Sequence, residues 1–344
     1  MILTRRRALS AIAAPALLGA PALLGMTRGA RADARTLKIS HQFPVSDGDK
    51  GDFRDRLVRR FAKDVEAKTN GALKFEIYPN SSLVKTFAQF NALKKGAIDF
   101  SLYPTTYSGG EIPELNLTFM PAIVTSYDQA YKWKNAEIGR QMTKLIEAKG
   151  VKIVTWVWQS GGIASRAKPL IKPADAAGIK IRGGSREMDM MFKAAGATTA
   201  NMPSNEIYVA MQTGAIDAAA TSSTSLLSFK LEELSKHLTS AKGKSFFFIF
   251  EPILMSAQTY NSLPADQQKA IMEVGESLEQ VGREGSIADD DTLVDVYRKA
   301  GIAVEEIDDA SLDQWKKVAA DSAWKDFAAR SADTAKFLEL AQKV

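Results

Sequence analysis

Arg182 is the residue of this sequence whose type and setting best fit a ligand-binding role. It ends the alternating run Ile-Lys-Ile-Arg at positions 179–182, which predicts a β-strand, and Gly183 and Gly184 follow it. Ligands of α/β proteins bind beyond the carboxyl ends of strands. A guanidinium offers paired N–H donors that match a carboxylate, and glycines let a ligand approach the backbone closely. The pattern therefore indicates a carboxylate site, with an ordinary surface arginine as the alternative.

Aromatic residues follow several other predicted strands. They are Phe43, Tyr103, Tyr107, Trp156, Trp158, Phe246, Phe247 and Phe248. Each one alone fits a protein core. Together they predict an apolar cleft, lined by aromatic rings around one cationic anchor, which is typical of small-molecule sites.

The sequence carries little that could perform catalysis. It has no Cys and two His, and it lacks the H-E-x-x-H, G-x-S-x-G and G-x-G-x-x-G patterns of several large enzyme classes. His41 follows a predicted strand and is the base that a hydrolase using the same cleft could employ, although a structural role fits it better. We therefore expect a binding protein rather than an enzyme, with no catalytic residue, no metal-ligand set and no cofactor. Whether a metal ion assists ligand binding stays open.

Residues 1–32 predict an export signal. Three arginines at positions 5–7 precede a stretch without charged residues, and an Ala-Arg-Ala cleavage site ends the segment. The arginines resemble a twin-arginine signal, and the general secretory route is the alternative. An uncleaved membrane anchor is a further alternative, since the uncharged stretch is long enough to span a bilayer. We expect removal of the segment and a location in the bacterial periplasm.

The net charge of +5 originates in the same segment. Five of the 45 Lys and Arg residues lie in residues 1–32, which contain no Asp or Glu, so the remaining chain balances the 40 acidic residues. A basic surface for nucleic acid is therefore not expected.

The order of predicted elements indicates an α/β fold. Residues 37–103 are expected to alternate strand, helix, strand, helix and strand, which is typical of a parallel sheet covered by helices. The order recurs from residue 151, where the β-branched and aromatic residues of 151–158 predict one strand. Gly-Ala-Ile-Asp follows a predicted helix at both 96–99 and 214–217. This repeat favours two lobes built on one plan. A long helical stretch from Pro264 to about Lys299 could brace both lobes.

The first predicted helix combines an apolar stripe with many charges. Apolar residues recur at every fourth position from 53 to 65 and predict one buried face. The charged residues on or beside this helix include Asp52, Arg54, Asp55, Arg56, Arg59, Arg60 and Asp64. We interpret this charged set as a solvated face.

Residues 178–217 carry the most specific pattern in the chain. The Gly-Ile-Lys-Ile-Arg strand is followed by Ala-Gly-Ala at 195–197 and by Glu-x-Tyr and Gln-x-Gly-x-x-Asp between 206 and 217. Shorter matches are Tyr-Pro-Asn at 78–80 and Leu-Pro-Ala-Asp-Gln-Gln at 263–268. With these motifs the mature chain resembles, over essentially its whole length, the periplasmic solute-binding proteins of tripartite ATP-independent (TRAP) transporters.

The resemblance implies an α/β, two-lobed periplasmic binding protein fold with a long bracing helix and a ligand cleft between the lobes. Lobe I is expected to contain residues 33–159 and 248–287, and lobe II residues 160–247 and 288–344. Arg182 aligns with the arginine that clamps the ligand carboxylate. The lobes are expected to close over a small organic acid. The closed protein, a monomer, would then dock on the membrane subunits of a TRAP permease.

Several pocket positions depart from the family members that bind sugar acids. A second arginine of those members is replaced by Gly162, with Arg166 nearby but out of register. An asparagine becomes Thr221, and a polar pair becomes Thr86-Phe87. These changes remove hydrogen-bonding groups and add apolar wall. They predict a less polar monocarboxylate, such as an aromatic or branched oxo acid.

The predicted ligand-binding residues are Arg182, Trp158, Thr221, Phe87, Tyr103, Phe248, Phe43 and Arg166. Two functions from other classes remain as alternatives. One is a periplasmic hydrolase that relies on His41 in the same cleft, and the other is a module that reports ligand to a membrane sensor.

Overall fold

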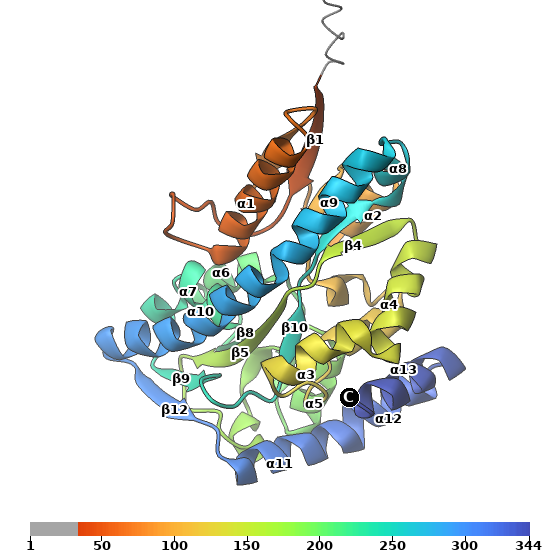
Figure 1. Ribbon diagram of the computed structural model, residues 1–344. Coiled ribbons are helices and arrows are strands. Elements are labelled where there is room, and N and C mark those ends of the chain that lie inside the picture. The colour runs from red at the N-terminus through yellow and green to blue at the C-terminus, as the bar shows by residue number, and fades with distance from the viewer. Residues whose placement is uncertain (1–33) are drawn as a thin grey trace, which may run out of the picture. The chain divides into compact units, whose positions relative to one another are not determined.

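The computed structural model describes residues 34–344 and contains two sheets, the first of which has five strands (Figure 1). Its strand order is β2-β1-β3-β11-β4. The strands are β1 (Arg35–Ser40), β2 (Leu73–Tyr78), β3 (Phe100–Leu102), β4 (Val151–Thr155) and β11 (Ile253–Ser256). The first three strands run parallel, and α1 (Phe53–Lys68) and α2 (Gln89–Lys94) connect them. The predicted strand–helix–strand–helix–strand start is thus confirmed, while the export signal lies outside the described residues.

A second, seven-stranded sheet has the order β12-β9-β5-β8-β6-β7, with β10 paired to β5. Its strands are β5 (Trp158–Ser165), β6 (Lys180–Arg182), β7 (Thr198–Ala200), β8 (Ala218–Ser222), β9 (His237–Ser240), β10 (Phe248–Phe250) and β12 (Ala303–Glu306). Strand β6 runs parallel to both of its neighbours, β7 and β8. Its carboxyl end, where Arg182 lies, therefore faces the same edge of the sheet as the carboxyl end of β8.

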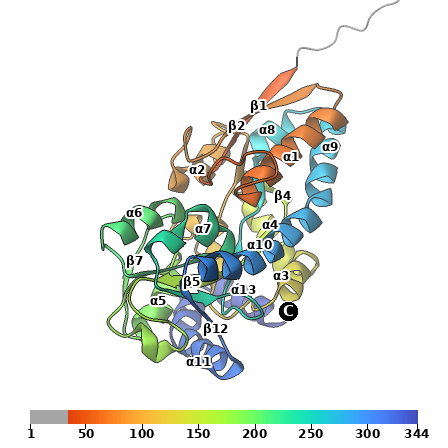
Figure 2. The same ribbon diagram turned by 90° about the vertical axis from the view of Figure 1, so that its left-hand side faces the viewer.

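Three connections join the two sheets. Strand β4 of the first sheet leads directly into β5 of the second, and β10 leads back into β11. The third connection is the predicted long helical stretch, which forms α9 (Ala265–Ser277) and α10 (Glu279–Lys299). Helix α9 packs on α1 and β4, whereas α10 packs on α1, α7 and β5 (Figures 1 and 2). The fold is therefore a two-lobed α/β fold with a bracing helical pair. The lobe boundaries given above stay a prediction.

The remaining helices cover the two sheets. They are α3 (Tyr127–Lys132), α4 (Glu137–Ala148), α5 (Arg186–Ala194), α6 (Ile207–Gln212), α7 (Ser223–Ser228), α8 (Ala257–Asn261), α11 (Asp309–Ala319), α12 (Lys325–Ala329) and α13 (Ala332–Gln342). Short 3₁₀ turns that matter for the site are η1 (Thr86–Ala88), η2 (Thr105–Ser108), η3 (Pro113–Phe119) and η6 (Ser204–Glu206). None of the helices within 34–344 has the length and apolar character that a membrane crossing needs.

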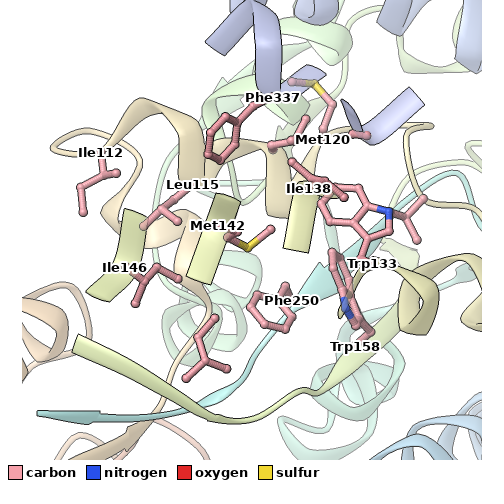
Figure 3. Close-up of a cluster of buried hydrophobic side chains, with 14 of the residues drawn as sticks. Ile112, Leu115, Met120, Trp133, Ile138, Met142, Ile146, Trp158, Phe250 and Phe337 are labelled. Carbon is pink, nitrogen blue, oxygen red and sulfur yellow. The ribbon is translucent and has the colours of Figure 1, made fainter. Parts of the chain in front are cut away.

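A large apolar cluster beside the five-stranded sheet fixes the start of β5. Trp158 is fully buried there, with its ring centroid 5.2 Å from that of Trp133 and 4.9 Å from that of Phe250 (Figure 3). Met142 and Ile146 of α4 pack in the same cluster. Because burial of such rings removes much apolar surface from water, this cluster holds the crossing strands β5 and β10 in place.

Candidate ligand-binding site

Arg182 is buried at the carboxyl end of β6, with 1% of its surface exposed. Its Nε donates to the carbonyl oxygen of Met202 at 3.1 Å, and its Nη1 donates to that of Ala220 at 2.8 Å. Its Nη2 lies 3.0 Å from the hydroxyl oxygen of Tyr107. All three acceptors are uncharged. No carboxylate oxygen of residues 34–344 comes within the 4.0 Å of an ion pair with this guanidinium.

The hydrogen-bond count of Arg182 leaves room for an anion. A guanidinium carries five N–H donors, and the three bonds above use one on each nitrogen. One N–H therefore remains on each terminal nitrogen. Two such donors are what a carboxylate needs for a charge-assisted pair of hydrogen bonds.

Tyr107 joins the two halves of the site. It lies in η2, which follows β3 of the five-stranded sheet, yet its hydroxyl oxygen accepts from Arg182 and from the backbone N–H of Ser204 at 3.1 Å. Within the described residues nothing accepts the proton of this hydroxyl. Tyr107 therefore offers one further donor beside Arg182. The sequence pointed to Tyr107 only as one aromatic residue among several, because its partners come from distant segments.

Gly184 makes room for the arginine itself. It has a φ of +93°, a region that favours glycine, and a Cβ at this position would collide with Nη1 of Arg182. The glycine was interpreted above as a point of close ligand approach. The structure shows instead that its first role is to let the guanidinium pack against the backbone.

A hollow of about 680 Å³ lies beside this arrangement. Phe87 and Tyr107 line it from one half, and Gly184, Asp189 and Lys193 line it from the other. Burial raises the pKa of Asp189 to about 6, although the positive charge of Arg182 acts in the opposite direction. Asp189 also accepts the backbone N–H of Gly183 at 3.2 Å, so a titratable carboxyl lies next to the loop that carries the arginine.

The structure gathers some of the predicted site residues around Arg182. The ring of Phe87 lies 5.2 Å from that of Tyr107, and the ring of Tyr103 lies 6.0 Å from it. Thr221 is buried and directly follows Ala220, the residue whose carbonyl holds Nη1 of Arg182. Phe87, Tyr103 and Thr221 thus share one neighbourhood with the arginine.

The other four predicted site residues make their contacts elsewhere in the structure. Trp158 packs in the apolar cluster, and the ring of Phe248 lies 5.0 Å from that of Tyr127. Phe43 lies under the guanidinium of Arg54, and Arg166 donates to the carbonyl oxygen of Met211. Within residues 34–344, none of these four is hydrogen-bonded to Arg182, whose side chain bonds to Met202, Ala220 and Tyr107. Their roles as ligand contacts stay predictions.

A second buried arginine overturns the interpretation of α1 as carrying a wholly solvated charged face. Arg54 is 0% exposed, and its guanidinium lies 2.7 Å from Asp52 and 3.1 Å from Glu251. It stacks 3.6 Å above the ring of Phe43. Asp55, on the same helix, is also fully buried and pairs with His41. The interpretation failed because these charges find partners that are remote in the sequence or just before the helix.

His41 is a structural residue. It is fully buried, its Nε2 lies 3.1 Å from Oδ1 of Asp55, and its Nδ1 accepts the backbone N–H of Phe43 at 3.3 Å. The Ser46 hydroxyl donates to Asp55 and not to His41, so these residues do not form a nucleophile–base pair. Among residues 34–344 no group of three metal-ligating side chains lies together either.

Comparison with known protein families identifies the family of this chain. The family described as bacterial extracellular solute-binding protein, family 7 (DctP), matches residues 52–331. The chain belongs to this family. DctP-family proteins are solute-binding receptors and not enzymes, so the hydrolase alternative is wrong, and the resemblance to TRAP solute-binding proteins is confirmed. The family is extracytoplasmic.

Individual relatives agree with this assignment. A solute-binding protein of Albidiferax ferrireducens is 51% identical over 312 residues, which cover 91% of this chain and 92% of the relative. The C4-dicarboxylate-binding periplasmic protein DctP of Rhodobacter capsulatus is 30% identical, covering 73% and 74%. A crystal structure of a TRAP periplasmic solute-binding protein from Rhodoferax ferrireducens with bound malonate superposes with a TM-score of 0.88. It is 52% identical and covers 89% of this chain and 97% of that one.

Proposed function

We propose that this DctP-family protein captures a small organic carboxylate on Arg182 and delivers it to a TRAP permease. The observation that carries the proposal is a buried guanidinium with two unused N–H donors and no carboxylate partner among the described residues. Burying a charge without a counterion is costly, so an anion that enters this site regains interactions that the protein alone leaves unmade. The malonate bound by the Rhodoferax ferrireducens relative supports the same ligand class.

Capture proceeds in our proposal by closure of the two halves. Arg182 and Ser204 lie on the side of the seven-stranded sheet, and Tyr107 lies on the side of the five-stranded sheet. A carboxylate held by the terminal nitrogens of Arg182 can also accept the Tyr107 proton. The ligand then interacts with both sides at once and stabilises the closed arrangement over the open one.

Within the carboxylates we propose an aromatic or branched oxo acid. The rings of Phe87 and Tyr103 flank Tyr107, and apolar walls suit a ligand with an apolar body. Malonate is the competing choice, because a relative binds it.

Delivery requires a permease and an extracytoplasmic location. We propose that the protein is exported through its first 32 residues, by the twin-arginine or the general secretory route, and acts as a monomer in the periplasm. Uptake of a labelled acid by cells with and without the permease genes tests this part.

The binding proposal is tested by thermal unfolding of the protein isolated from the periplasm and refolded to remove carried-over ligand. The panel contains malonate, aromatic and branched oxo acids, and sugar acids, each with its amide as a control. A ligand at 100 times its Kd adds roughly 2.7 kcal/mol to the free energy of unfolding, which raises the midpoint visibly. We expect a shift with an acid and none with its amide. Equal shifts with acid and amide, or no shift with any acid, would overturn carboxylate capture.

A further inference from the structure

Arg54 connects three segments that are far apart in the sequence. Its backbone N–H and its Nε both donate to Asp52, the residue that caps the start of α1, each at 2.9 Å. Its Nη1 donates to Glu251 at 3.1 Å, between β10 and β11. The same nitrogen lies 3.1 Å from the Ser225 hydroxyl and 3.3 Å from the Ser222 hydroxyl, at the start of α7.

These contacts belong to different sheets. Asp52 adjoins the five-stranded sheet, since α1 follows β1. Glu251 lies in the connection that leads from β10 of the seven-stranded sheet to β11 of the five-stranded sheet. Ser222 ends β8 of the seven-stranded sheet, and Ser225 lies in the first turn of α7. If the halves separate, the bonds to the carboxylates can persist, whereas the bonds to the two serines must break.

Strand β8 links the two arginines. Ser222, which Arg54 contacts, lies two residues after Ala220, whose carbonyl oxygen accepts from Nη1 of Arg182 at 2.8 Å. Strand β8 is paired on one side with β5 and on the other with β6, which carries Arg182. A paired strand transmits displacement along its length better than a loop does, because its ladder bonds fix its register.

We propose that Arg54 is a positioning residue which locks the closed form by hydrogen bonding to Ser225 and Ser222, and that this lock holds β8, and through it Arg182, in the ligand-binding geometry. The inference rests on the proposed closure over a carboxylate. It assigns the lock to residues outside the ligand site, with Glu251 and Asp52 holding the guanidinium in place in both states.

Ser225 is the place to test the lock with least disturbance. Its hydroxyl accepts from Arg54 and from Ser222, while its backbone N–H keeps the cap of α7 by donating to the Ser222 hydroxyl at 3.2 Å. Ser225→Ala therefore removes the contact with Arg54 and leaves the helix cap. Ser228→Ala is the matched control on the same helix, because its hydroxyl has no hydrogen-bond partner among the described residues.

The experiment measures association and dissociation rates of malonate by stopped-flow tryptophan fluorescence. A hydrogen bond that forms only on closure affects the release of ligand more than its entry. We expect Ser225→Ala to raise koff about tenfold, the size of one bond to a charged group. The association rate and the unfolding midpoint of the ligand-free protein should stay unchanged. Ser228→Ala should match the wild type. An unchanged koff would overturn the lock. So would changes of equal size in the association and dissociation rates, together with a lower unfolding midpoint of the ligand-free protein.

A ligand-independent measurement separates the failure of the lock from the failure of the proposed function. The chain has no cysteine, so Leu83→Cys and Val209→Cys, both at exposed positions, accept two spin labels without competition. They lie near the Thr86–Asn205 contact, which crosses between the halves at 3.3 Å. If the wild type binds no acid, carboxylate capture fails. In that case the lock is tested by the distribution of distances between the two spin labels in the ligand-free protein. The lock predicts a smaller closed fraction in Ser225→Ala than in the wild type, and an unchanged distribution would overturn the lock.

Discussion

Arg54 and Arg182 are both fully buried arginines, and they differ in their partners. Arg54 lies within ion-pair distance of two carboxylates, those of Asp52 and Glu251. Arg182 contacts two backbone carbonyls and one hydroxyl, all of them neutral. The chemistry of the side chain is the same in both places. What each arginine does therefore follows from whether the fold itself supplies the counterion.

The difference separates a structural charge from a binding charge. Burial alone disfavours the charged form of Arg54, but the two carboxylates outweigh it and raise the pKa of its guanidinium above the ordinary value. The positive charge of Arg54 is therefore balanced by carboxylates inside the folded protein, and removing the arginine leaves these two buried acids unpaired. Arg182 has no such ion-pair partner within residues 34–344, so in our proposal the carboxylate of the ligand balances its positive charge. Removing it should thus cost ligand affinity more than stability.

The largest effect is expected for Arg54→Met, on the free energy of unfolding, and it would sharpen the contrast between the two arginines. The substitution leaves Asp52 and Glu251 buried without their cation, and breaking a buried pair in this way typically costs about 3–5 kcal/mol. We expect a loss of this size in the free energy of unfolding of the ligand-free protein, measured by urea denaturation. Arg60→Met, an exposed position on the same helix, is the control and should change stability by less than about 0.5 kcal/mol. A loss no larger than that of the control would remove the distinction between the two arginines.

The converse experiment is Arg182→Met. Truncating one partner of a buried charge pair costs about 2–5 kcal/mol in affinity, which is roughly 30-fold to several thousand-fold. We expect this loss for the bound acid by isothermal titration, with a change in ligand-free stability below about 1 kcal/mol, because the lost neutral hydrogen bonds and the relieved buried charge oppose each other. Arg182→Lys should also bind more weakly, since a point charge cannot replace the fork. Full affinity in either folded variant would contradict the assignment of Arg182.

The sequence predicted much of the framework around these residues. The alternation of strands and helices up to β3, and helix α1 with apolar residues at every fourth position, follow from local properties. The helical stretch after Pro264 was likewise expected, and it forms α9 and α10. One predicted strand over 151–158 proved to be two, β4 and β5, because the chain passes from one sheet to the other at Trp156 and Val157. No local pattern marks that passage, since all residues of the two strands except Lys152 are buried.

The partners of the buried charges could not be predicted in the same way. Arg182 stood out because a strand end and two glycines surround it, which are features of neighbouring residues. The burial of Arg54 depends on Glu251, Ser222 and Ser225, more than 150 positions away. Tyr107 likewise gains its role from Arg182 and Ser204. Only the tertiary fold brings these groups together. The sequence therefore shows which residues carry a charge, whereas the structure shows which of these charges have an oppositely charged partner within the protein.

A smaller effect is expected for Tyr107→Phe. The variant keeps the ring against Phe87 but removes the oxygen that accepts from Arg182 and Ser204, and with it the remaining donor proton. Loss of one hydrogen bond to a charged group predicts about a tenfold weaker Kd, measured by titration. Tyr103→Phe is the control, because its buried hydroxyl contacts Ser108 and not Arg182. Equal losses of affinity in both variants would show that Tyr107 acts through packing and not through its hydroxyl.

The smallest expected effect concerns Asp189, an acid that lies beside the loop carrying Arg182. Because burial raises the pKa of Asp189 to about 6, this carboxyl is mostly ionised at pH 7.5 and mostly protonated at pH 5. Its negative charge partly offsets that of Arg182 and so competes with an incoming anion.

Asp189→Asn mimics the protonated form at every pH and tests this competition. We expect it to bind the acid on the order of threefold more tightly than the wild type at pH 7.5, and equally well at pH 5, where the wild-type carboxyl carries little charge. Comparing the two proteins at each pH cancels the titration of the ligand itself. Weaker binding by Asp189→Asn at pH 7.5 would mean that the carboxylate orients the loop of Gly183 more than it repels the ligand. Arg182 would then depend on a carboxylate of the protein itself, as Arg54 does. The two arginines would differ only in how strongly they depend on such a carboxylate.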